Sequence, residues 1–143
     1  MFTTDRLRLR GYEESDLDLL RKLWNTEAVQ RTISIDYLRP RSLNFKEFIE
    51  KKADAPGLFV IIETNKPGTF PQFVGFANLD LQHQKHRDAN YSIALMPEFW
   101  GKGYATEVTK FAVDHGFHHF GLHRISLGVL GGNETARNVY KKM

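Results

Sequence analysis

The sequence predicts a mixed α/β fold, and three observations lead to this prediction. Arg6–Arg10 alternates strictly between charged and apolar residues, which is typical of a half-buried strand. Leu58–Ile62 is continuously apolar and rich in β-branched residues, as in a buried strand. Tyr91–Glu107 passes from strand-like alternation through a glycine-rich turn into a helical pattern. Strands and helices therefore follow one another along one chain.

The N-terminal third is predicted to form one strand and two helices. The leucines of Arg6–Arg10 should point inward and its arginines should form a solvated face. A first helix should begin at Ser15, a good N-cap, and end near Asn25. An irregular segment follows over 27–41, and a second helix should start near Ser42. Its apolar face comprises Phe45, Phe48, Ile49 and the stem of Lys52.

The remainder is predicted to add four strands and two helices. After Leu58–Ile62 come a strand over Phe73–Leu81, with Gly75 as a candidate bulge, and a strand beginning near Ala89. A helix from Tyr104 carries a face of small residues, and a strand over Arg124–Leu130 follows it. Asn133 can cap a last helix. The predicted order is β-α-α-β-β-β-α-β-α.

The turn after the strand that ends before Pro97 has the features of an anion site. A strand that leads through glycines into a helix leaves backbone N–H groups unpaired at the positive end of the helix dipole. Gly101 and Gly103 lack a Cβ, so a phosphate can approach closely, and Lys102 adds a cation. The alternative is a turn that needs glycine only for its dihedral angles. The spacing is neither a dinucleotide fingerprint nor a P-loop.

Trp100–Ala105 resembles the acetyl-CoA motif R/Q-x-x-G-x-G/A of the GNAT superfamily of N-acetyltransferases, except that Trp100 replaces the first Arg or Gln. Three blocks in order resemble its subgroup of ribosomal-protein N-terminal acetyltransferases. They are Thr4–Arg10, Trp100–Glu107 and the C-terminal block of His123–Leu127 with Asn133, Glu134, Ala136 and Tyr140–Lys142. The resemblance covers nearly the whole chain.

The resemblance implies the acyl-CoA N-acyltransferase fold, with a mostly antiparallel central sheet flanked by helices. It implies one N-acetyltransferase domain over 1–143. Family members continue with two more strands after the last helix, whereas this sequence ends at Met143 within it. We therefore expect the C-terminal hairpin to be missing. An uncovered strand edge favours pairing with another chain, so a homodimer is a candidate assembly.

The resemblance also implies acetyl transfer from acetyl-CoA to a primary amine of a small molecule or a protein N-terminus, by direct attack in a ternary complex. The backbone of Ile93 and Leu95 would pair with the pantetheine arm, and Asn133 would contact CoA. Tyr140 would protonate the departing thiolate. The residues that would hold the pyrophosphate are Trp100, Gly101, Lys102, Gly103, Tyr104, Ala105 and Thr106.

Two catalytic candidates carry alternatives. Asn133 and Tyr140 are seven residues apart and share one helix face. A phenol of pKa ~10 near a thiolate of pKa ~8.5 can donate a proton as charge develops, although Tyr140 could instead pack its ring in a core. Glu98 follows the strand that should face the reacting centre, which makes it the candidate general base or a solvated surface carboxylate.

Composition bounds the other function classes. The chain has 143 residues, no cysteine, a net charge of +3 and a pI of about 9.2. Disulfides, thiolate metal sites and a cysteine nucleophile are excluded, and the charge is too small to indicate nucleic-acid binding. His115, His118 and His119 have metal-like spacing, but a helix C-terminus favours histidines electrostatically, so we expect no metal. We also expect no membrane segment and a cytoplasmic location. A non-catalytic CoA-binding or interaction module remains the alternative function.

Overall fold

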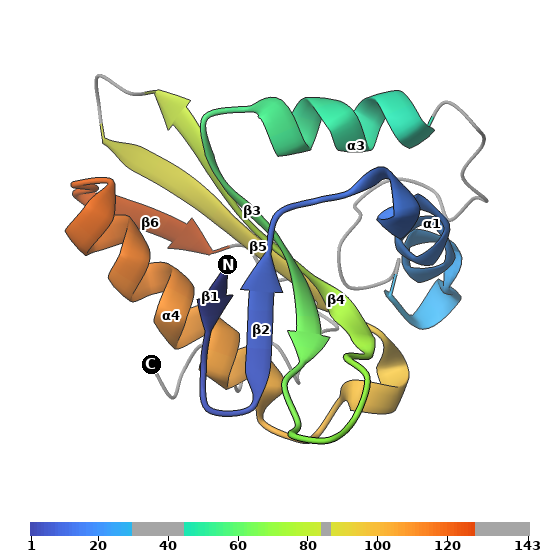
Figure 1. Ribbon diagram of the computed structural model, residues 1–143. Helices are drawn as coiled ribbons and strands as arrows, with labels where there is room; N and C mark the ends of the chain where they lie inside the picture. Colours follow the sequence, from blue (N-terminus) through green and yellow to red (C-terminus); the bar gives the residue numbers. More distant parts are fainter. Residues whose placement is uncertain (30–44, 84–86, 128–143) are drawn as a thin grey trace.

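A computed structural model describes residues 1–29, 45–83 and 87–127 (Figure 1). These residues form a six-stranded sheet in the order β1-β2-β3-β4-β5-β6. Neighbouring strands are antiparallel except β5 and β6, which run parallel. The strands are β1 (Phe2–Thr3), β2 (Leu7–Arg10), β3 (Gly57–Thr64), β4 (Phe73–His83), β5 (Asp88–Leu95) and β6 (Arg124–Leu127). The predicted mixed fold with a mostly antiparallel sheet is confirmed.

Helices cover both faces of this sheet. α1 (Leu17–Asn25) and α3 (Phe45–Asp54) lie on one side, and α4 (Tyr104–His119) lies on the other (Figure 1). Two residues of β4 mark the two faces. The Phe76 ring stacks on Trp24 of α1 with centroids 4.6 Å apart, whereas Leu79 packs beside Gly116 of α4. No helix in the described ranges combines the length and apolar character needed to cross a membrane.

The strongest sequence patterns are confirmed. Leu7 and Leu9 of β2 are fully buried, as the alternation predicts. α4 begins at Tyr104, and its small residues Ala112 and Gly116 are buried against the sheet. A Cβ on Gly116 would lie 3.0 Å from Ile125 Cδ1, so glycine permits this close packing. The last predicted helix and the end of the strand over Arg124–Leu130 lie outside the described residues.

One local prediction was wrong. The predicted cap at Ser15 is not used, because the chain enters α1 through a short 3₁₀ helix, η1 (Glu14–Asp16). Glu13 and Asp16 form a capping box in which the Asp16 carboxylate accepts the Glu13 N–H at 2.8 Å. Phe48 lies on the predicted face of α3, where its ring contacts those of Phe45 and Trp24, although the side chain remains 40% exposed.

The irregularity in β4 lies beside Gly75. Ile62 pairs with Gly75 and Glu63 with Phe73, so Val74 is the inserted residue between them. Gly75 has a different requirement, because a Cβ there would lie 2.0 Å from the Ala94 carbonyl oxygen. The glycine therefore allows β4 and β5 to approach where β5 ends.

The arginines of β2 were predicted to form a solvated face, but they form ion pairs instead. Arg10 binds Asp16 through two hydrogen bonds of 2.6 and 2.8 Å and also binds Glu63. These partners, Asp16 first, raise the pKa of Arg10 above its ordinary range against the opposing effect of burial. Arg8 reaches Glu63 at 3.4 Å. This network of charged hydrogen bonds, which are stronger than neutral ones, connects β2 to η1 and β3.

A ring cluster joins β1 to the C-terminal half of α4. The His115 ring contacts the rings of Phe2, Phe111, His119 and Phe120, with centroids 4.6–5.5 Å apart. Burial and the neighbouring His119 lower the pKa of His115 below its ordinary value of 6.5, and Asp114 opposes them. The folded state therefore binds fewer protons than the unfolded chain once the pH falls below that value.

When the pH is lowered from 7.5 to 5.5, we expect the thermal midpoint of the wild-type protein to fall by about 1–3 °C more than that of a His115→Phe variant. The variant keeps the ring contacts but cannot be protonated. Scanning calorimetry of both proteins over this range measures the difference. Parallel pH profiles for the two proteins would show that His115 does not contribute to the pH dependence.

Candidate active site

The turn between β5 and α4 has the backbone that the sequence predicts. β5 ends at Leu95, the 3₁₀ helix η2 (Pro97–Phe99) follows, and α4 starts after Gly103. Gly101 and Gly103 have φ angles of 76° and 81°, in the left-handed region that disfavours side chains. The glycines thus serve the dihedral angles of the turn, and they also leave it open.

We call residues 100–106 the phosphate turn. Within the described part of the chain, the N–H groups of residues 101–106 have no hydrogen-bond acceptor. The first helical bond runs from the Glu107 N–H to the Gly103 carbonyl at 3.1 Å, and no side chain caps the helix. Successive unpaired N–H groups at a helix start form a site for an anion.

The outer edge of β5 leads into this turn. The Met96 N–H bonds to the Val74 carbonyl at 2.8 Å, and antiparallel ladders alternate between bonded and non-bonded pairs. The backbone groups of Ile93 and Leu95 therefore point away from β4, toward the edge where a pantetheine arm was predicted to pair. The described part of β6 pairs only with Asp88–Tyr91.

Trp100 has a contact that the motif does not suggest. Its indole Nε1–H donates to the Leu95 carbonyl at 2.9 Å, while the side chain remains 40% exposed. The ring thus binds the last carbonyl of β5 and connects the strand end to the phosphate turn. This contact gives a physical reason for a tryptophan where the family motif has Arg or Gln.

The other predicted residues of the turn are accessible. Lys102 is exposed, with Nζ 5.9 Å from the centre of the Phe99 ring and no carboxylate partner among the described residues. Tyr104, Ala105 and Thr106 are half-buried in the first turn of α4. Lys102 is therefore placed to meet an incoming anion without first breaking an ion pair.

The catalytic candidates are only partly described. Glu98 is an exposed residue of η2, two positions before the first residue of the phosphate turn. Asn133 and Tyr140 lie outside the described residues, so their predicted roles remain predictions. The structure thus brings together Ile93, Leu95, the phosphate turn and Glu98 at one end of β5.

The sequence patterns did not assign a role to three residues, Thr4, Arg6 and Glu107, that form a hydrogen-bonded group beside the turn. Arg6 donates from Nη1 to the Lys102 carbonyl at 2.7 Å and from Nε to Glu107 Oε1 at 2.9 Å. The Thr4 hydroxyl and the Arg6 N–H also donate to Glu107. Burial opposes ionisation of Glu107, but these hydrogen bonds outweigh it and lower its pKa. Only the block over Thr4–Arg10 hinted at a role for this segment.

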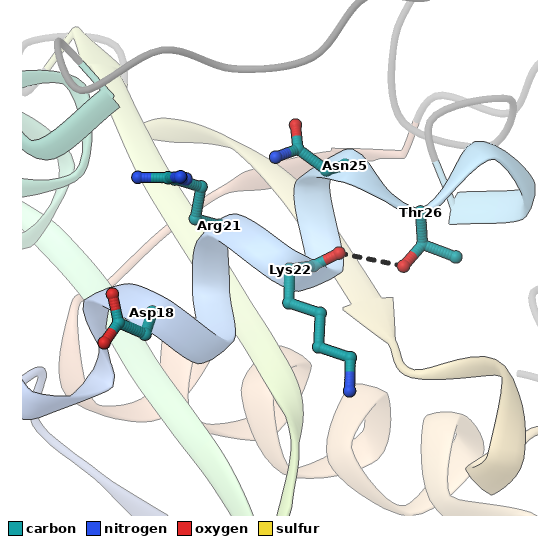
Figure 2. Close-up of a pocket in the computed structure, with 5 residues that line it drawn as sticks. All are labelled: Asp18, Arg21, Lys22, Asn25 and Thr26. Carbon is teal, nitrogen blue, oxygen red and sulfur yellow. Dashed lines mark hydrogen bonds between the residues drawn. The ribbon is translucent and has the colours of Figure 1, made fainter.

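A separate pocket lies on α1 (Figure 2), where Lys22 O accepts a hydrogen bond from the Thr26 hydroxyl at 2.8 Å. It includes none of the predicted site residues, and its two cations outnumber its one carboxylate. In the described ranges, no three His, Cys, Asp or Glu side chains are grouped to hold a metal ion. The lining residues are Asp18, Arg21, Lys22, Asn25 and Thr26.

A mixed sheet whose β5 passes through an open glycine turn into α4 is the architecture of a GNAT-type acetyltransferase. The sequence matches the model of the acetyltransferase (GNAT) domain over residues 6–143, and the chain belongs to this family. It is therefore an N-acetyltransferase.

Relatives and solved structures agree with this membership. The chain is 41% identical to spermidine N(1)-acetyltransferase of Escherichia coli (strain K12), covering 96% of this chain and 71% of the relative. The crystal structure of spermidine N-acetyltransferase from Vibrio cholerae in complex with CoA and spermine matches with a TM-score of 0.81 and 25% identity, covering 95% of this chain and 78% of that one. A dodecameric structure of the Vibrio cholerae enzyme matches with a TM-score of 0.73 and 26% identity, covering 95% and 77%.

These findings confirm the superfamily but not the finer subgroup. The relatives described above act on spermidine by name, whereas the sequence blocks suggested ribosomal-protein N-terminal acetyltransferases. The block at Thr4–Arg10 contains β2, and the block at Trp100–Glu107 contains the phosphate turn, where the sequence predicts a contact with the cosubstrate and not with the acceptor. They therefore do not discriminate between acceptor classes.

Proposed function

We propose that this protein acetylates a primary amine of a small polyamine of the spermidine type, using acetyl-CoA. The observation that carries the proposal is the 41% identity to the Escherichia coli spermidine enzyme over 96% of this chain. The match to a Vibrio cholerae structure that holds CoA and spermine supports the same pair of substrates. A protein N-terminus as acceptor has no such support.

The described geometry suits acetyl-CoA. The unpaired N–H groups of residues 101–106 and the exposed Lys102 would bind the pyrophosphate. The outward backbone groups of Ile93 would pair with the pantetheine amides. Since Trp100 already occupies the Leu95 carbonyl, Leu95 would offer its N–H alone. This arrangement would direct the thioester along the edge of β5.

Transfer would proceed by direct attack. The amine nitrogen forms a bond to the acetyl carbon, the C–S bond breaks, and the thiolate leaves with a proton from Tyr140. The amine proton passes to Glu98 or to water. An alkyl amine of pKa ~10.4 costs on the order of 4 kcal/mol to deprotonate near neutral pH, compared with about 1 kcal/mol for an α-amine. A polyamine acceptor therefore makes greater demands on the base.

The acceptor class can be tested with a panel of amines. At equal acetyl-CoA, we expect kcat/KM for spermidine to exceed that for an alanine- or serine-initiated peptide by at least about 100-fold. A site built to bind a second cationic amine leaves its polar groups unpaired when a peptide replaces it. Putrescine and spermine as further acceptors measure the required spacing between amines. Preference for the peptide would contradict the proposal and support the N-terminal subgroup.

The non-catalytic alternative makes a different prediction in the same assay. A CoA-binding module would bind acetyl-CoA but would turn over none of the amines in the panel. Self-association also remains a proposal, supported by the dodecamer of the Vibrio cholerae enzyme, and sedimentation velocity of the purified chain tests it. The cytoplasmic location stays a prediction from the sequence.

A further inference from the structure

Arg6 lies immediately before β2, and its side chain contacts both Lys102 in the phosphate turn and Glu107 just after the turn. Its Nη1 donates to the carbonyl of Lys102 at 2.7 Å, and its Nε pairs with Glu107 in the first turn of α4 at 2.9 Å. The guanidinium also lies over the Tyr104 ring, 4.7 Å from its centre. One side chain thus contacts a residue before the start of α4 (Lys102), the first residue of α4 (Tyr104) and a residue in its first turn (Glu107).

The bond to the Lys102 carbonyl determines where the next N–H points. In a trans peptide the C=O and the following N–H lie on opposite sides of the chain. Because Arg6 holds the Lys102 carbonyl toward β2, the Gly103 N–H is directed away from β2 and into the phosphate turn. Without this bond, the left-handed angles at Gly101 and Gly103 leave the peptide free to rotate, since glycine imposes little restriction.

Arg6 also compensates an unfavourable charge. The Glu107 carboxylate lies in the first turn of α4, where a bound phosphate would be repelled by it. Hydrogen bonds from Thr4 and from the side chain and backbone of Arg6 satisfy this carboxylate. The remaining Nη2 lies 3.2 Å from the position that a Cβ on Gly103 would take, and it has no acceptor among the described residues.

We propose that Arg6 is a positioning residue for the cosubstrate: it orients the Lys102–Gly103 peptide and neutralises Glu107, so that the phosphate turn accepts a pyrophosphate. This inference rests on the proposed use of acetyl-CoA. In this proposal Arg6, just before β2, compensates for the departure of Trp100 from the Arg or Gln of the motif. Trp100 binds the strand end, and Arg6 supplies the fixed cation beside the turn.

The test compares Arg6→Gln with Arg8→Gln as a matched control. Both substitutions remove one positive charge from neighbouring positions at the start of β2, but Arg8 pairs with Glu63 and not with the phosphate turn. Isothermal titration should show that acetyl-CoA binds about tenfold more weakly to the Arg6→Gln protein and within about twofold of wild type to the Arg8→Gln protein. Steady-state kinetics of the Arg6→Gln protein should show a higher KM for acetyl-CoA and an unchanged KM for the amine.

Folding is monitored separately, because the Arg6 side chain is 48% exposed but its partner Glu107 is only 16% exposed. In the variant, Glu107 keeps its hydrogen bonds from the Thr4 hydroxyl and the residue 6 N–H. The melting temperature of Arg6→Gln should stay within a few degrees of wild type. If this variant does not fold, Arg6→Lys replaces it: lysine keeps the charge but cannot bond to both Lys102 and Glu107, so binding should weaken at least about threefold.

The outcomes separate this inference from the proposed function. Wild-type protein that fails to bind acetyl-CoA contradicts the proposed function itself. Wild-type binding that survives unchanged in Arg6→Gln and Arg6→Lys overturns the positioning role alone. An equal loss in Arg6→Gln and Arg8→Gln also overturns it, because net charge would then explain the effect.

Discussion

Replacing Tyr140 by phenylalanine is expected to lower kcat by roughly 10²–10⁴-fold, the range associated with loss of a general acid. The substitution removes the hydroxyl that would protonate the departing CoA thiolate and keeps the ring. KM for acetyl-CoA should change little, because the hydroxyl acts as charge develops and not in the ground state. Single-turnover kinetics with spermidine at saturating acetyl-CoA measures the chemical step directly.

Tyr12→Phe is the matched control for this experiment. Tyr12 lies outside the predicted site, and its buried hydroxyl has no hydrogen-bond partner among the residues that the structure describes. Removing that hydroxyl should leave kcat within about twofold of wild type. Full turnover by Tyr140→Phe under conditions where chemistry limits the rate would remove Tyr140 from the mechanism and leave proton donation to water.

Replacing Gly103 by glutamate is expected to weaken acetyl-CoA binding by at least about 100-fold. A carboxylate at the N-terminus of α4 would repel the pyrophosphate and occupy its space. The φ of 81° adds strain for any side chain, on the order of 1–2 kcal/mol. The new Cβ would also lie 3.2 Å from Arg6 Nη2, which is tight but is relieved by movement of a flexible side chain. Calorimetric titration measures the loss.

Gly68→Glu separates the anion effect from backbone strain. Gly68 has a φ of 79° in the exposed β3–β4 connection, and a Cβ there meets nothing within 4 Å. It therefore carries the same charge change and similar strain away from the phosphate turn. We expect its acetyl-CoA affinity to stay within about threefold of wild type. Comparable affinities for the two variants would show that the turn does not bind the pyrophosphate.

The sequence alone predicted those elements whose structure depends on a local pattern of residues. Alternation correctly predicts the inward leucines of β2, and Pro97 with the two glycines marks the passage from β5 to α4 within a residue or two. These features follow from backbone chemistry that each segment carries alone. The longer strands of the sheet and the glycine-rich turn between β5 and α4 were therefore predictable without the structure.

Contacts between distant segments were not predictable in this way. Arg6 and Glu107 are 101 positions apart, and no periodicity relates them. The bond from Trp100 to Leu95 depends on how η2 folds the chain back, and a tryptophan in that motif position gives no sign of it. β1 was missed because Phe2 and Thr3 are too few residues to show alternation. Asn133 and Tyr140 stay predictions.

The most direct test is a calorimetric titration of acetyl-CoA into the purified 143-residue chain, with dephospho-CoA and adenosine as controls. Both CoA compounds carry the pyrophosphate, and adenosine does not. We expect saturable binding of acetyl-CoA and dephospho-CoA and no measurable binding of adenosine. No binding of acetyl-CoA, or adenosine binding as tightly as acetyl-CoA, would contradict the assignment of the phosphate turn.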